Sequence, residues 1–142
     1  MRFWDTSALM HLVVRQARHA EAERWLSEDG LVAAWTLTQI EMLSAVHRLA
    51  REGQLDGPTA RATERSVADV MSRAHLVSDV RGVKTRAQRL LRTHALRAAD
   101  ALQLAAALAW ASDQPSDRVL HTFDARLGRA AEREGFRVIP DA

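Results

Sequence analysis

The sequence predicts an α/β fold with a parallel sheet and helices on both of its faces. Short apolar runs alternate along the chain with longer segments whose apolar residues recur at helical spacing. Such alternation is typical of strands joined by helical crossovers, which give parallel pairing. No linker, internal repeat or low-complexity stretch divides the 142 residues, so we expect a single domain over residues 1–142.

The expected strands are short apolar runs, and the expected helices are amphipathic segments between them. The strands are predicted at residues 2–4, 31–35, 76–77, 119–123 and 136–139. The helices are predicted at residues 6–13, 19–28, 38–52, 59–74, 80–91, 96–111 and 125–134. We expect Gly30 and Gly135 to close the helices before them, and Thr38 and Glu41 to form a capping box. The tryptophans are predicted to lie in the core rather than to stack on bases.

Composition excludes several classes of protein. There is no cysteine, so disulfides, zinc–thiolate sites and thiol catalysis are ruled out. The net charge is only +2, although the sequence pI is about 10.3. The high pI arises because Lys84 is the only lysine, the other cations are arginines, and tyrosine and cysteine are absent. No signal peptide or membrane span is visible, so we expect a cytoplasmic protein with no membrane partner.

Four carboxylates lie at junctions where a predicted strand ends and a predicted helix begins. Asp5 and Asp124 end strands, while Glu41 and Asp100 lie in the first turns of helices. In an open parallel sheet, ligands bind outside the carboxyl ends of the strands, so these side chains are candidates for one site. Each of them alone is equally explained by helix capping or by the helix dipole.

Asp100 is the hardest to explain as a cap, because an almost wholly apolar helix follows it. An uncompensated buried carboxylate costs several kcal/mol. If the four converge, they need either bound protons or a divalent cation. Carboxylates without a histidine or thiolate partner suit Mg²⁺ or Mn²⁺, which can activate water and stabilise phosphoryl oxygens.

At these residues the chain resembles the PIN-domain nucleases, and specifically the short bacterial VapC-type toxins of type II toxin–antitoxin pairs. The resemblance spans the whole length. It rests on Phe3-Trp-Asp5-Thr-Ser7-Ala-Leu, Thr38-x-x-Glu41, Ala99-Asp100-Ala-Leu-Gln-Leu-Ala and Thr122-Phe-Asp124-x-x-Leu127. It implies a three-layer α/β/α sandwich around a parallel sheet and Mg²⁺- or Mn²⁺-dependent endoribonuclease activity. It also implies an RNA substrate, a homodimer and a cognate antitoxin protein.

The resemblance also implies roles for individual residues. Asp5 and Asp100 would be the main metal ligands. Glu41 and Asp124 would complete the acidic catalytic site, through water or at a second ion. Ser7 and Thr122 match hydroxyl positions that support the ligands or position water.

The densest basic stretch runs from Arg81 to Arg97, with no acid between Asp79 and Asp100. This stretch is compatible with two interpretations. It forms a solvated helix face, or it forms a face that, together with Arg97, binds RNA phosphates beside the metal.

Two other functions compete with the nuclease. A catalytically silent PIN scaffold that only binds RNA or protein is disfavoured by the complete acidic set. A phosphoacceptor receiver domain would need adjacent acids after the first strand and a lysine after a late one. The sequence has neither, since Thr122-Phe-Asp124 ends the late strand.

Overall fold

The structure is a computed structural model that describes residues 1–141. Its strands are β1 (Arg2–Trp4), β2 (Val32–Trp35), β3 (His75–Val77), β4 (Val119–His121) and β5 (Arg137–Ile139). Its helices are α1 (Thr6–Val13), α2 (His19–Glu28), α3 (Thr38–Arg51), α4 (Gly57–Arg73), α5 (Val80–Thr93), α6 (Ala98–Trp110) and α7 (Ala125–Glu134). Every expected element is present, with ends that differ from the expected ones by a residue or two.

The strands form one parallel sheet in the order β3-β2-β1-β4-β5. The chain moves from β1 outward to β2 and β3, then crosses back to β4 and continues to β5 on the other side. The strand order therefore reverses between β1 and β4. This reversal is the place where an open parallel sheet forms its ligand crevice, and it lies where Asp5 and Asp124 leave their strands.

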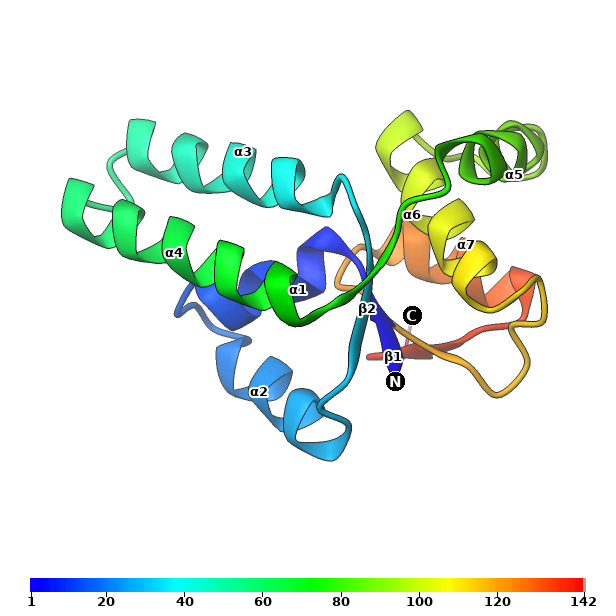
Figure 1. Cartoon of the computed structure of the whole chain (residues 1–142), viewed down its shortest axis with the longest axis horizontal. Coiled ribbons are helices and arrows are strands. Elements are labelled where there is room, and N and C mark those ends of the chain that lie inside the picture. Colours follow the sequence, from blue (N-terminus) through cyan, green and yellow to red (C-terminus); the bar gives the residue numbers. More distant parts are fainter. Residues whose placement is uncertain (142) are drawn as a thin grey trace.

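Helices cover both faces of the sheet, which confirms the three-layer α/β/α sandwich. In Figure 1, α1 to α4 lie on one side of the strands and α5 to α7 on the other. Each face has its own core, because successive side chains of a strand point to opposite faces. In β1, Phe3 packs into the core under α5 to α7, while Trp4 packs into the core under α1 to α4.

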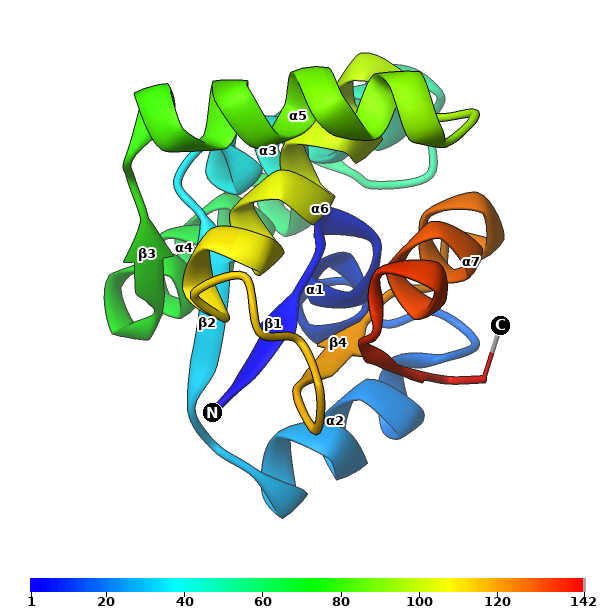
Figure 2. The same cartoon turned by 90° about the vertical axis from the view of Figure 1, so that its right-hand side faces the viewer.

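Helix α6 is apolar on nearly every side because it is covered on nearly every side. It packs against α5, β2 and β3, and Figure 2 shows it lying beside α5. The expected tryptophan core is present as well: Trp4, Trp25 and Trp35 are buried, and Trp110 is half-buried against Phe3.

The two glycine caps have different outcomes. Gly135 ends α7 in a left-handed conformation with φ 107°, which favours glycine and confirms the prediction. The prediction for Gly30 is wrong. Asp29 ends α2 with an extended backbone, and Gly30 has no positive φ, so the chain passes into β2 without a left-handed turn.

None of the helices in residues 1–141 is long and apolar enough to cross a membrane.

Candidate active site

All four predicted carboxylates line one cavity at the carboxyl edge of the sheet. The cavity has a volume of about 420 Å³ and is bordered by Asp5, Glu41, Asp100 and Asp124. They come from the ends of β1 and β4 and from the first turns of α3 and α6. The reversal of strand order brings these four segments together although they span most of the chain.

Asp5 lies at the centre of a hydrogen-bond network and is 4% exposed. It caps α1, because its Oδ1 accepts from the backbone N–H of Ala8 at 2.9 Å. Its Oδ2 accepts from the Thr122 hydroxyl at 2.6 Å, and the Ser7 hydroxyl donates to Oδ1 at 2.7 Å. Burial raises the pKa of Asp5 to about 6 despite these bonds, and the nearby charge of Asp124 adds to the rise.

The hydroxyls of Ser7 and Thr122 also fix the chain that follows β4. Ser7 Oγ accepts from the backbone N–H of Phe123 at 2.8 Å. Thr122 Oγ1 accepts from the backbone N–H of Asp124 at 3.0 Å. Through these bonds the loop that carries Asp124 is held against Asp5. Both hydroxyls therefore contact a carboxylate, as the resemblance implied.

Glu41 does not belong to a capping box, and that prediction is wrong. Helix α3 begins at Thr38 itself, and its N-cap residue, Leu37, makes no side-chain capping bond. The Glu41 carboxylate is turned into the cavity instead, where it accepts from Thr6 Oγ1 at 3.0 Å and from Gln103 Nε2 at 3.1 Å. Burial raises the pKa of Glu41, and the charge of Asp100 acts in the same direction.

Asp100 and Asp124 form the other wall of the cavity. Asp100 lies in the first turn of α6 and is half-buried. Burial is the largest cause of the raised pKa of Asp100, and repulsion from Asp124 raises that pKa further. Asp124 caps α7, because its Oδ1 accepts from the backbone N–H groups of Arg126 and Leu127 at 2.8 and 2.9 Å. The two interpretations of Asp124, as a cap and as a site residue, are therefore compatible.

The donor set fits a hard divalent cation in chemistry and charge. The carboxylate oxygens are the ligands that Mg²⁺ and Mn²⁺ prefer. Three of the four carboxylates have a raised pKa, so their surroundings favour a bound proton or cation. Across residues 1–141, however, no group of three or more histidine, aspartate or glutamate side chains is placed to hold a metal ion together. The fit therefore extends to the type of ligand and not to a closed coordination shell.

Sequence reasoning missed three residues that organise the site: Thr6, Thr38 and Gln103. Gln103 Nε2 contacts Thr6 Oγ1 and Thr38 Oγ1, both at 2.9 Å, in addition to Glu41. Gln103 was visible as the one polar interruption of an apolar helix, which is a usable signal. The threonines carried no such signal, because their role depends on how α6 packs against α1 and α3.

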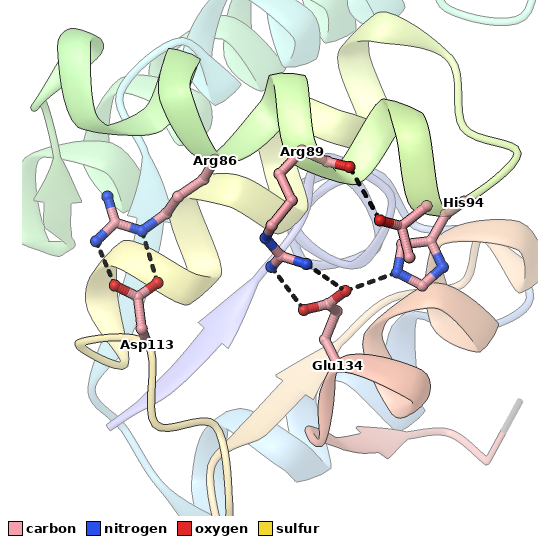
Figure 3. Close-up of polar contacts among 6 residues, drawn as sticks. Arg86, Arg89, His94, Asp113 and Glu134 are labelled. Carbon is pink, nitrogen blue, oxygen red and sulfur yellow. Dashed lines mark hydrogen bonds and ion pairs between the residues drawn. The ribbon is translucent and has the colours of Figure 1, made fainter.

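Two arginines of the basic stretch, both on α5, are paired with acids of other segments. Arg86 forms a bidentate pair with Asp113 at 2.7 Å, and Arg89 pairs with Glu134 at 2.7 and 3.1 Å (Figure 3). Asp113 follows α6 and Glu134 ends α7, so both partners lie at helix ends opposite the ones that line the cavity. These pairs favour the interpretation of a solvated helix face for Arg86 and Arg89, and contact of the other basic residues with RNA stays a prediction.

The fold and the site together define an α/β/α protein whose candidate functional groups are carboxylates at the reversal point of a parallel sheet. The family model described as "PIN domain" matches residues 2–133. The chain is also 32% identical over 141 residues to "Ribonuclease VapC45" of Mycobacterium tuberculosis (strain CDC 1551 / Oshkosh). That match covers 97% of this chain and 94% of the relative. The chain belongs to the PIN-domain family.

Solved structures of other proteins have the same fold. PAE2754 from Pyrobaculum aerophilum superimposes with a TM-score of 0.66 at 24% identity, covering 97% of this chain and 88% of that one. A toxin–antitoxin complex from Klebsiella pneumoniae contains a chain with a TM-score of 0.64 at 18% identity, covering 89% of this chain and 88% of that one. At these identities the likeness is one of fold.

Proposed function

We propose that this chain is the toxin of a toxin–antitoxin pair and that it acts as a metal-dependent endoribonuclease, hydrolysing RNA phosphodiester bonds. The observation that carries the proposal is the gathering of Asp5, Glu41, Asp100 and Asp124 around one cavity at the reversal point of the sheet. The name of the relative from M. tuberculosis, a ribonuclease, supports the same activity.

Mg²⁺ is the proposed cofactor, with Mn²⁺ as a substitute, and Asp5 and Asp100 are its proposed direct ligands. Such an ion supplies a more acidic water molecule and offsets charge on the phosphate and the leaving oxygen. Two direct carboxylates suffice for Mg²⁺, which usually keeps several of its waters. This arrangement agrees with the lack of a three-ligand group among the residues that the structure describes.

The protein side chains have proposed tasks of their own. Ser7 and Thr122 hold the Asp5 carboxylate in one orientation through their hydroxyls. Thr6 and Gln103 fix the Glu41 carboxylate, whose raised pKa suits a group that accepts a proton from the attacking water. Asp124 shares the cavity with Asp100 and completes the acidic site.

The proposal extends to partners and setting. A cognate antitoxin is supported by the complex from K. pneumoniae, whose chain shares this fold. We propose in addition that the chain forms a homodimer, that residues 1–142 make a single domain, and that its place of action is the cytoplasm, where its RNA substrate is made.

The test is cleavage of a mixed-sequence RNA by the purified chain. We expect cleavage with Mg²⁺ or Mn²⁺, loss of cleavage with EDTA and recovery when the ion is restored in excess. We also expect Mn²⁺ to raise the melting temperature, because a ligand that binds only the folded state stabilises it. If cleavage and the melting shift are both absent, a PIN scaffold that only binds would replace the nuclease.

A further inference from the structure

Helix α7 carries three arginines on one face: Arg126, Arg129 and Arg133. Their spacing places them within about one side of the helix, since residues three and four apart are neighbours. They border a hollow of about 170 Å³ together with His94 and Leu96 of the segment that joins α5 to α6. A water molecule occupies about 30 Å³ in the liquid, so the hollow has room for a phosphate group.

The three guanidinium groups are exposed to solvent, and Arg126 lies near the charge of Asp100. Within residues 1–141 none of the three forms an ion pair. The two acids of the helix do not border the hollow: Glu132 is exposed, and Glu134 accepts from Arg89 and lies 2.7 Å from His94 Nε2 (Figure 3). The hollow is therefore cationic and has a wall that is fixed in place.

Part of this arrangement is unfavourable for the helix itself. Like charges three and four residues apart destabilise a helix by about 0.2–0.5 kcal/mol for each pair. Arg126 also lies in the first turn, next to the positive end of the helix dipole, where cations are disfavoured. Features that break a local rule without a compensating contact are expected at functional sites.

The hollow and the acidic cavity are neighbours. Asp124 caps the same helix that carries the arginines. Arg126 is close enough to Asp100 to lower the pKa of that carboxyl by its charge. An RNA strand that is cleaved at the carboxylates and continues along α7 therefore passes this arginine face.

We propose that the hollow between α7 and the α5–α6 segment binds a backbone phosphate of the same RNA strand that is cleaved at the acidic cavity. The inference rests on the proposed nuclease function and names where that site holds its substrate. Arginine is suited to this task, because its planar guanidinium forms bidentate bonds with phosphate. Arg129 and Arg133 provide the grip, and Arg126 joins the hollow to the acidic cavity.

The test compares two double variants that remove the same charge. Arg129→Ala/Arg133→Ala removes two of the guanidinium groups that border the hollow. Arg24→Ala/Arg65→Ala removes two exposed arginines from α2 and α4, the helices on the other face of the sheet. Neither Arg24 nor Arg65 forms an ion pair within the described residues. Affinity for a labelled single-stranded RNA is measured by fluorescence anisotropy in EDTA over a range of salt concentrations. Thermal melting checks that both variants are folded.

We expect the α7 variant to bind RNA at least about tenfold more weakly, since each charge-assisted bond that is removed is worth about that factor. The slope of log affinity against log salt should fall by about 0.7 for each phosphate that the variant no longer neutralises. The control variant should change both quantities much less.

An equal loss in the two variants, or unchanged affinity and slope in the α7 variant, would overturn the inference. Unchanged RNA binding combined with weaker binding of polyglutamate would assign the hollow to an acidic protein segment, which overturns it too. Cleavage by the unaltered chain with Mg²⁺ is scored separately. A chain that cleaves RNA but binds it independently of Arg129 and Arg133 retains the proposed function and loses only this inference.

Discussion

Replacing Asp5 by asparagine should stabilise the metal-free protein above pH 6. Burial raises the pKa of this carboxyl from 3.8 to about 6. A shift of about 2 units is worth ~3 kcal/mol at 1.36 kcal/mol per unit. Because the folded-state pKa lies above the unfolded one, this stability is fully present below pH 3.8 and is lost as the pH rises through 6.

The asparagine variant avoids that loss but gives up part of the hydrogen-bond network. Its single carbonyl oxygen can still accept from Ala8, as a helix cap does. The amide group cannot accept from Thr122 as well, so that hydroxyl must turn, which costs about 1 kcal/mol. The net gain at pH 8 is then about 2 kcal/mol, or a rise of about 4–8 °C in Tm for a domain of this size.

The assay is urea denaturation followed by tryptophan fluorescence, in EDTA, at pH 4 and pH 8. We expect the free energies of unfolding of the variant and the unaltered chain to differ little at pH 4 and by about 2 kcal/mol at pH 8. The exposed Asp69→Asn serves as the control and should show no such gain. A variant that is less stable at pH 8, or a difference that does not depend on pH, would show that the buried Asp5 carboxylate does not destabilise the fold.

Three further variants test other parts of the structure by the same denaturation assay. Gln103→Leu should cost about 1–3 kcal/mol, because Glu41 and Thr38 lose their buried donor; an unchanged stability would contradict its organising role. Burial lowers the pKa of His121 to about 4, so its neutral ring contributes stability above pH 6.5 that is lost as the pH falls toward 4, by ~3 kcal/mol. His121→Phe should reduce that pH dependence, and an identical pH profile would count against it. Gly135→Ala should cost about 1–3 kcal/mol, because a residue with a side chain is strained at φ 107° and its Cβ would lie 3.2 Å from Pro115; a neutral effect would argue against the cap.

Much of the fold could be predicted from the sequence because its signals are local. Alternation of apolar runs with amphipathic segments was enough to predict the parallel sheet and its helices. Asp5 and Asp124 were found because parallel strands end at a common edge, so residues at strand ends must gather. Asp100 could be predicted because a buried carboxylate at the start of an apolar helix lowers the stability of the fold unless a partner compensates its charge.

The missed features depend on contacts between distant segments. Arg86 and Arg89 pair with acids 27 and 45 residues further along the chain. Pairing over such distances has no signature in the spacing of residues along the chain, so the sequence of this helix suggests an unpaired basic face. The sequence suggests a capping box for Glu41 because that motif joins residues only three positions apart, whereas the observed partners, Thr6 and Gln103, are 35 and 62 residues away.

The acidic cavity should hydrolyse RNA, and the rate of RNA cleavage by Asp100→Asn measures whether it does. Asp100 is half-buried in the cavity, while Asp69 is exposed on α4 and bonds to Arg73. With saturating Mg²⁺, we expect Asp100→Asn to cleave at least about a hundredfold more slowly than the unaltered chain, because the ion that Asp100 helps to hold would offset charge on the phosphate. Asp69→Asn should cleave at the unaltered rate. Full activity in Asp100→Asn, or an equal loss in both variants, would mean that the acidic cavity is not where RNA is cleaved.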